Sequence, residues 1–459
     1  MTRGSLMIEA PLADDQPQPV RAPGDPDRSD LVNRRLGRRT FVNGAAAVIA
    51  AIAGLGRAAG TAARPIARQS PGGDAATQAS PAPAGTSVRL SYVSGSTAKI
   101  EQIIGDYDRQ LQQPTLNQTQ SRYGLVGTDL GNSFEHEGKV YFLFGDNAAP
   151  GARDPLGYSE SADPDGPLRL DFLSARPGSF IPVGAPGVRM GPFEVPVAGL
   201  SLDGTMYVVV STNHSADRST DTSVLLRFDP RARTFSVVRE ISRLPSGHFI
   251  KMTLRLVPEG LAGLPSAAPH VLMFASGEYR RSNAYLAAVP AQSFASGENA
   301  RYLAGLDGAV PHWSERQEDA APIVVHPTIG DLSVSFVPQP GLWVMNYDSR
   351  EPRGVLLRYA AQPWGPWSEP SIIFNLERDH ALGSFIHDPR LRPDDGLAGP
   401  VAGPQDPAQV AGGGYAPYII ERFTRVQDNM LTLQYLLSTW NPYTVVRLRS
   451  TLAIATADT

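Results

Sequence analysis

The sequence contains no cysteine, so disulfide bridges and thiolate metal sites are excluded. A phosphate-cradling glycine loop, a His-x-x-x-His pair and a GxSxG motif are also absent from the chain. The motifs therefore indicate no metal site and no cofactor. A structural Ca²⁺ ion, which carbonyl and carboxylate oxygens from distant segments can hold, stays an open alternative.

An excess of positive charge is also missing. The chain has 41 Lys and Arg residues against 45 Asp and Glu residues, which gives a formal net charge of −4. Proteins that bind nucleic acid or an anionic membrane surface usually carry a basic patch or stripe, and none stands out along this sequence. We therefore expect no nucleic-acid partner.

The N-terminal region is typical of an export signal. The segment GRRTFVN contains the pair Arg38 and Arg39, and a short Ala/Gly-rich apolar stretch, 44–56, follows it. Small residues at 58–63 then offer a cleavage site. This order predicts a twin-arginine signal over residues 1–63, read by the twin-arginine export machinery, and a secreted, periplasmic or envelope location. The alternative is a cytosolic protein with a chance Ala-rich helix.

The same apolar stretch is about 13 residues long, and a membrane-spanning helix needs about 20. We therefore expect no stable membrane span. Residues 64–87 are rich in Pro, Ala, Gly and Ser, which predicts a flexible linker. No comparable linker interrupts residues 88–455, which favours one domain there.

Short apolar runs rich in Val, Leu, Tyr and Phe, separated by turn residues, predict an all-β domain. One type of run closes on small or polar residues, at 138–146, 204–212, 269–278, 340–348 and 429–441. A second type follows each of them, at 156–164, 223–230, 283–290, 354–361 and 443–450. A further strand precedes each pair.

Five such units indicate a five-bladed β-propeller. The alternative is a pair of β-sandwiches, which gives no reason for a fivefold repeat. Residues 97–112 are the one segment where we predict a short helix.

Propeller geometry predicts which residues meet. The start of the first strand, the end of the second and the start of the third share one rim in every blade. Polar and aromatic residues at these positions are candidate site residues. They are Asp129, Asp146, Glu194, Asn213, His214, His248, Lys251, Glu278, Tyr279, Arg280, Asp331, Tyr347, Asp348, Tyr418, Trp440, Asn441 and Tyr443.

This combination of side chains suits a sugar, because aromatic faces stack on C–H surfaces while acids and amides bind hydroxyls. Paired carboxylates also suit glycosidic bond cleavage, one as acid and the other as base or nucleophile. For any single residue the structural alternative is that it caps a turn, as the pair Asp146 and Asn147 can. Asp129 precedes an apolar strand, where a carboxylate must find a partner or solvent.

These segments also carry a resemblance. GTDLGNSFEHEGKVYFLFGD, GEYRRSNAYLA, GDLSVSF and the closing LSTWNPYTVVRLRS resemble the domain of unknown function 4185 family, over roughly residues 88–453. Part of that family is classed as glycoside hydrolase family 183. The resemblance implies a five-bladed propeller that cleaves D-arabinan internally. It implies Asp129 and Asp146 as the catalytic pair and Asp331 as a third acid.

The sequence thus predicts a secreted glycoside hydrolase whose partner is a furanose-containing polysaccharide, with an acid/base mechanism on two carboxylates. Asp129 as base, Asp146 as acid and inversion at the anomeric carbon are the favoured assignment, and the exchanged roles stay open. The alternative is a non-catalytic carbohydrate-binding propeller with the same rim. A structural or protein-interaction propeller is a third class, and it requires neither carboxylates nor aromatic residues to converge.

Overall fold

The computed structural model describes residues 87–148, 153–174, 176, 178–215, 219–401 and 405–456. The predicted export signal, residues 1–63, and residues 64–86 of the predicted linker lie outside this range. In the part of the chain that is described, no helix is long and apolar enough to cross a membrane.

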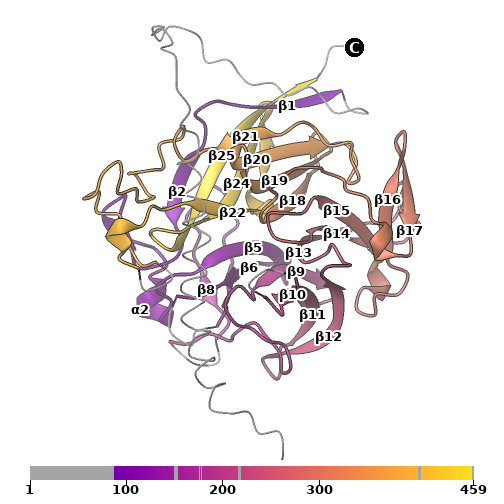
Figure 1. The fold of residues 1–459 in the computed structure, drawn as a ribbon, viewed down its shortest axis with the longest axis horizontal. Helices are drawn as coiled ribbons and strands as arrows, with labels where there is room; N and C mark the ends of the chain where they lie inside the picture. Colours follow the sequence, from indigo (N-terminus) through magenta and orange to yellow (C-terminus); the bar gives the residue numbers. More distant parts are fainter. Residues whose placement is uncertain are drawn as a thin grey trace, which may run out of the picture.

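The described residues form a five-bladed β-propeller, which confirms the predicted fold class (Figure 1). Blade one contains β5 (Asp129–His136), β6 (Lys139–Gly145), β7 (Leu156–Ser159) and β8 (Asp171–Phe172). Blade two contains β9 (Pro196–Leu202), β10 (Thr205–Thr212), β11 (Thr222–Asp229) and β12 (Thr234–Arg243). Every predicted strand run falls on one of the propeller strands.

Blades three to five follow the same antiparallel order. Blade three contains β13 (Lys251–Val257), β14 (His270–Ser276), β15 (Ala284–Pro290), β16 (Arg301–Asp307) and β17 (Val310–Ser314). Blade four contains β18 (Leu332–Val337), β19 (Leu342–Arg350), β20 (Arg353–Ala360) and β21 (Ser371–Phe374). Blade five contains β22 (Gly414–Ile419), β24 (Met430–Thr439), β25 (Thr444–Thr456) and β1 (Val88–Tyr92), with β23 (Arg425–Gln427) beside β24.

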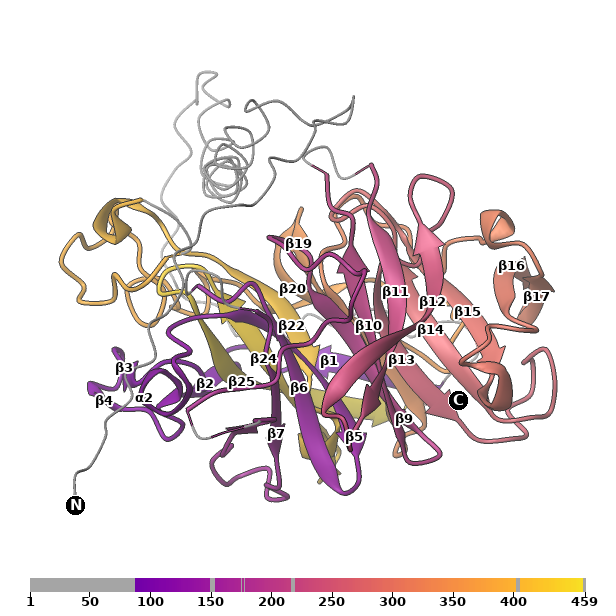
Figure 2. The ribbon, with the colours of Figure 1, turned by 90° about the horizontal axis from the view of Figure 1, so that it is seen from below.

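Blade five closes the ring because it combines both ends of the described chain. Strand β1 pairs antiparallel with β25, from Val88 opposite Thr456 to Tyr92 opposite Leu452. The inner strands β5, β9, β13, β18 and β22 each contact the next, and β22 contacts β5 again. Figure 1 shows the blades arranged around this ring, and Figure 2 shows the propeller from the side. Each blade therefore buries its two faces against its neighbours.

The predicted helix over 97–112 is wrong. This segment forms β2 (Ala98–Gln102), which pairs with β25, and the short strands β3 (Tyr107–Asp108) and β4 (Gln113–Pro114). Strand β25 is long enough to offer its edge to both β1 and β2. Backbone hydrogen bonds to that edge outweigh the weak helical preference of this sequence. The helix nearby is instead α2 (Thr119–Tyr123).

Packing between blades relies on aromatic side chains inserted against the neighbouring strand. Phe134 of β5 lies against Gly199 of β9, where an added Cβ would come within 2.1 Å of the Phe134 ring. Only glycine leaves room for the ring at this position. Buried Val, Leu, Phe and Tyr side chains form further hydrophobic clusters in the core.

Candidate active site

All five inner strands begin on the same face of the propeller, which we call the strand-start face. Asp129, Lys251 and Leu332 are the first residues of β5, β13 and β18. Strand β22 begins at Gly414, one residue before Tyr415. The antiparallel pairing also returns the end of each second strand to this face, as Gly145 opposite Asp129 shows. The propeller topology therefore gathers acidic and aromatic residues that are far apart in sequence.

Asp129 is the central carboxyl of this face. It is 8% exposed, and its Oδ2 accepts a hydrogen bond of 2.8 Å from the Tyr415 hydroxyl. Its Oδ1 has no hydrogen-bond partner among the described residues. A β-bulge between Leu130 and Asn132 follows directly in β5. Bulges re-aim neighbouring side chains, and here the bulge adjoins a buried carboxyl with one unsatisfied oxygen.

Asp146 follows β6 in the left-handed backbone region, with a φ of 43°. Its Oδ1 accepts a hydrogen bond of 2.9 Å from the backbone N–H of Phe193. Its backbone carbonyl accepts one of 2.8 Å from the Tyr443 hydroxyl. Asp146 is half-buried, so its carboxylate is more accessible to solvent than that of Asp129.

Burial and neighbouring carboxylates raise the pKa of two acids of blade one. Burial raises the pKa of Asp129 well above its ordinary value, and the nearby charge of Asp146 raises it further. The pKa of Asp154 is raised well above its ordinary value by burial first, and then by Asp146 and Asp129. Carboxyls that repel one another in a dry site cannot all ionise together. Asp129 and Asp154 therefore retain protons to a higher pH than free carboxyls do.

A second acidic pair lies in blade four. Asp348 accepts hydrogen bonds from Arg280 through Nη2 at 2.6 Å and Nε at 3.1 Å, and from the backbone N–H of Asp331 at 2.9 Å. Asp331 accepts hydrogen bonds from the hydroxyls of Tyr279 at 3.1 Å and Tyr418 at 3.2 Å. Asp348 is thus committed to an ion pair with Arg280, whereas Asp331 is held by neutral donors.

Lys251 supplies a buried cation between the two acidic groups. Burial raises the pKa of Asp331, while the charge of Lys251 lowers it and that of Asp348 raises it. Lys251 also lowers the pKa of Asp154. Its Nζ lies 5.9 Å from the centroid of the Tyr279 ring. The strand-start face therefore combines protonatable acids with fixed positive charge in a site shielded from water.

The tyrosines of this face remain hydrogen-bond donors. Burial and the charge of Asp129 raise the pKa of Tyr415 and Tyr443 well above the ordinary value. Burial and Asp331 do the same for Tyr418. These hydroxyls therefore stay neutral through the physiological range. They can donate to the acids or to a ligand.

The structure brings together Asp129, Asp146, Asp331, Tyr279 and Arg280, the residues predicted from blades one, three and four. The predicted residues of blade two, Glu194, Asn213 and His214, lie at the edge of this group, where Glu194 stabilises the neighbouring loops. Buried Glu194 pairs with Arg189 and accepts hydrogen bonds from the backbone N–H groups of Gly191 at 2.6 Å and His214 at 3.0 Å. The imidazole of His214 bonds Asp221 at 3.1 Å, and Asn213 is exposed.

Two predicted site residues prove to be interior. Tyr347 is fully buried between blades three and four, where its hydroxyl accepts a hydrogen bond of 3.0 Å from Nε of Arg358. It is not on the rim, because β19 continues beyond it to Arg350 and its side chain points into the blade interface. Asn441 is also fully buried, and it donates to the carbonyls of Pro407 and Val410. It therefore anchors the segment around Pro407 and Val410, and its side chain does not face the rim.

The three remaining predicted residues lie between these extremes. The half-buried ring of His248 stacks on the Tyr285 ring, with centroids 4.4 Å apart. Trp440 is 8% exposed and packs edge-to-face against Tyr443, with ring centroids 5.7 Å apart. Half-buried Glu278 forms an ion pair of 2.7 Å with Arg281.

Asp154 and Tyr415 complete the site and were missed in the sequence. Asp154 lies two residues before β7, the third strand of blade one. Tyr415 is the second residue of β22, the first strand of blade five. Both positions satisfy the rim rule that identified the other residues, so strand position was the signal available. In the described part of the chain, no three His, Asp or Glu side chains form a cluster that could hold a metal ion.

Comparison with solved structures finds only distant similarities. The chain is 10% identical to a protein of unknown function from Dyadobacter fermentans, covering 78% of this chain and 100% of that one with a TM-score of 0.35. A GH43_1 enzyme from Xanthomonas citri is 11% identical (72% and 90% covered, TM-score 0.39). An endo-arabinase from Bacteroides thetaiotaomicron is 11% identical (73% and 96% covered, TM-score 0.37). At this level of similarity, the fold assignment depends on the strand topology of this chain.

No curated protein matches the sequence. The family comparison is more specific, because one match extends over residues 115–449, well over half of the chain. This range begins before α2 and ends in β25, so it includes all the carboxylates of the strand-start face. The chain belongs to the family described as a domain of unknown function (DUF4185).

Proposed function

We propose that this protein is an exported glycoside hydrolase that cleaves a furanose-containing polysaccharide with the acids of the strand-start face. One observation carries the proposal: the buried Asp129 carboxyl, with a raised pKa and one unbonded oxygen, lies beside the half-buried Asp146. Glycosidic cleavage requires a pair of this kind, with one carboxyl protonated and the other ionised.

The environments of the two acids favour Asp129 as general acid and Asp146 as general base, the reverse of the assignment favoured from sequence. Burial and repulsion keep the proton on Asp129. Asp146 is more exposed, and a backbone N–H at 2.9 Å supports its ionised form. A solvent-accessible carboxylate is the better placed of the two to activate water.

Two arguments support the substrate class. The donors and acceptors around the two acids, Lys251, Arg280, Tyr279, Tyr415 and Tyr418, suit a ligand with many hydroxyls. The sequence resemblance to endo-D-arabinan-cleaving members of the family makes D-arabinan the first substrate to test. Export through the twin-arginine machinery, suggested by Arg38 and Arg39, would place the enzyme where such polymers occur.

The test is incubation of the purified protein with D-arabinan, L-arabinan, fructan and envelope arabinogalactan, followed by chromatography of released oligosaccharides. We expect oligosaccharides from D-arabinan. Asp129→Asn and Asp146→Asn should each reduce turnover about 10²–10⁴-fold, because each removes a positioned proton-transfer group. Asp203→Asn is the matched control, since Asp203 is exposed in the β9–β10 turn on the other face and should retain full activity.

Two results would contradict the proposal. Near wild-type turnover in Asp129→Asn or Asp146→Asn would remove that residue from the mechanism. Binding of arabinan without any released product would favour the carbohydrate-binding propeller.

A further inference from the structure

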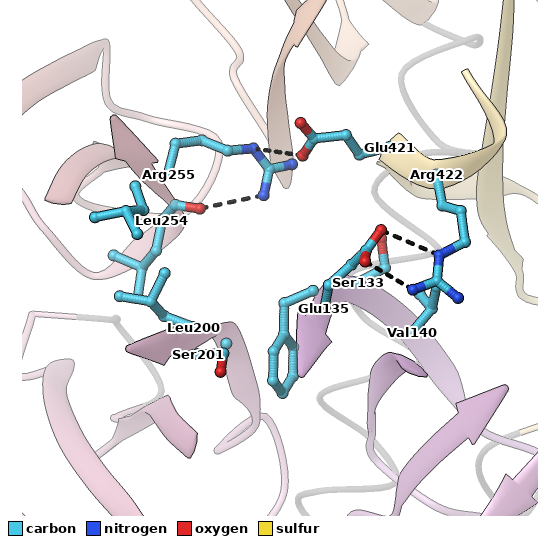
Figure 3. Close-up of a pocket in the computed structure, with 12 residues that line it drawn as sticks. Ser133, Glu135, Val140, Leu200, Ser201, Leu254, Arg255, Glu421 and Arg422 are labelled. Carbon is cyan, nitrogen blue, oxygen red and sulfur yellow. Dashed lines mark hydrogen bonds and ion pairs between the residues drawn. The ribbon is translucent and has the colours of Figure 1, made fainter. Parts of the chain in front are cut away.

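The opposite face of the propeller, where the inner strands end, contains a cavity of about 340 Å³. We call it the strand-end cavity. Its walls come from the last residues of β5, β9 and β13 and from the turn after β22 (Figure 3). Glu135, near the end of β5, lies six residues from Asp129, or about 20 Å along an extended strand. The cavity is therefore separate from the candidate active site.

Two ion pairs cross the strand-end cavity. Arg422 binds Glu135 with two hydrogen bonds, from Nε at 3.1 Å and Nη2 at 2.7 Å. Arg255 faces Glu421 with Nε and Oε2 3.4 Å apart (Figure 3). The pairs join blade one to blade five and blade three to blade five. Four charged side chains from three blades thus converge on one small space.

The arginines and the glutamates differ in exposure. The side chains of Arg255 and Arg422 are only 12% and 16% exposed, whereas those of Glu421 and Glu135 are 48% and 54% exposed. Arg255 is further fixed by hydrogen bonds to the carbonyls of Val334 and Leu254. The guanidinium groups are therefore rigid donors at the wall, and the carboxylates are accessible acceptors with lone pairs to spare.

Apolar groups complete the wall. Phe134, Leu200, Leu254 and Leu256 line the cavity together with Gly199. Leu256 is 47% exposed, which is unusual for a leucine in a strand of this propeller. An apolar wall beside a ring of donors and acceptors matches the two surfaces of a sugar, its C–H face and its hydroxyls.

The charge balance restricts the ligand further. Two cations and two anions leave the strand-end cavity without net charge. An anionic ligand would meet the two exposed carboxylates, and a cation would meet the two guanidinium groups. A hydroxyl donates and accepts, so it can bind a carboxylate and a guanidinium together. We propose that the strand-end cavity is a second carbohydrate site, which binds one or two neutral sugar units without cleaving them.

The size of the strand-end cavity agrees with this class, since pockets for small ligands begin at about 300 Å³. The proposal relies on the proposed function only for the choice of the first probe. A second sugar site on the far face would hold a polymer near the enzyme while the strand-start face cleaves it.

The test is saturation-transfer NMR and calorimetric titration with a D-arabinan tetrasaccharide, xylotriose, galactobiose, galactose and galacturonic acid. The Asp129→Asn/Asp146→Asn double variant is used so that no probe is consumed. We expect at least one neutral probe to bind with a Kd of about 1 mM or tighter. Glu421→Gln and Glu135→Gln should each weaken this binding about tenfold or more, because each removes a charged acceptor. Galacturonic acid should bind more weakly than galactose.

Leu256→Trp fills the strand-end cavity without altering the ion pairs and should abolish this binding. Leu306→Trp is the control, because Leu306 is 38% exposed on β16 and does not line the cavity. In the active protein, Leu256→Trp should leave hydrolysis of the tetrasaccharide unchanged, which separates this site from the catalytic one. The proposal is overturned if no neutral sugar binds, if Glu421→Gln and Leu256→Trp leave the number of sugars bound per protein unchanged, or if galacturonic acid binds more tightly than galactose.

Discussion

The Tyr415 hydroxyl donates a hydrogen bond of 2.8 Å to Oδ2 of Asp129, across 286 residues of sequence. It connects the first strand of blade five to the first strand of blade one, where the ring closes. Strand β22 makes a second such bond, from Tyr418 to Asp331 in blade four. Ring closure and the positioning of both buried acids therefore depend on the same strand.

Replacing Tyr415 with Phe should raise the pKa of Asp129 further, because the lost hydrogen bond favours the ionised form. If Asp129 is the general acid, activity is lost at high pH as Asp129 ionises. The alkaline limb of the pH–rate profile should then move to higher pH in the variant. The measurement is kcat/KM against pH for both proteins. An unchanged alkaline limb would show that Asp129 does not set it.

Asp154→Asn should stabilise the protein at high pH. The pKa of Asp154 is higher in the folded state than in the unfolded state, because burial disfavours the ionised carboxylate. The stability that the protonated carboxyl contributes is therefore fully present below the unfolded pKa and is lost as pH rises through the folded pKa. The variant has no such loss. Its melting temperature should exceed that of the wild type at pH 8, by roughly 2–4 °C per kcal/mol, and the difference should shrink at pH 4.

Asp165→Asn is the control, because the pKa of Asp165 is shifted in the opposite direction to that of Asp154. Asp165 is exposed, and its hydrogen bonds with Arg425 lower its pKa. Its contribution to stability is present above the unfolded pKa and is lost as pH falls, so its replacement should not stabilise the protein at pH 8. Thermal scans from pH 4 to pH 8 distinguish the two variants. A melting temperature for Asp154→Asn below the wild type at pH 8 would contradict the prediction.

Tyr347→Phe should affect stability and leave activity intact. The substitution removes the acceptor of the hydrogen bond from Nε of Arg358, which is buried, while the ring still fills its place. An unsatisfied buried donor costs about 1–3 kcal/mol. Denaturant titration should show this loss, and kcat/KM should stay at the wild-type value. A fall in kcat/KM without a loss of stability would instead support a substrate-binding role for Tyr347.

Arg38→Lys together with Arg39→Lys should keep the protein in the cytoplasm, because the export machinery reads the arginine pair and not only its charge. The matched control is Arg34→Lys with Arg35→Lys, a neighbouring pair that does not precede the Thr-Phe segment. Cell fractionation and immunoblotting measure the outcome. Normal export of the first variant would refute the assignment of the signal.

The fold was predictable because the sequence features that determine it are local and recur in every blade. Each blade needs alternating apolar residues and turns, and the runs at 138–146 and 204–212 show both features. The segment 97–112 was misassigned because its structure depends on a distant partner. The β25 edge, more than 340 residues away, supplies the hydrogen bonds that make Ala98–Gln102 a strand.

The candidate site was predictable in outline, since strand position places a residue on the rim. Asp129, Asp146 and Asp331 follow from that rule. The rule does not give the direction of a side chain. Tyr347 and Asn441 lie near the correct strand ends, but their side chains are buried and bonded to Arg358 and to the carbonyl of Val410.

The sequence by itself thus determined the propeller, its five repeats and the acids at its rim, because strand periodicity and turn residues act over short distances. Only the tertiary structure decided which of those acids are buried together. The raised pKa of Asp129 arises first from burial and then from the charge of Asp146, and the strand-end cavity is lined by residues of four blades. Both depend on distances between residues that are far apart in sequence, and those distances exist only once the ring has closed.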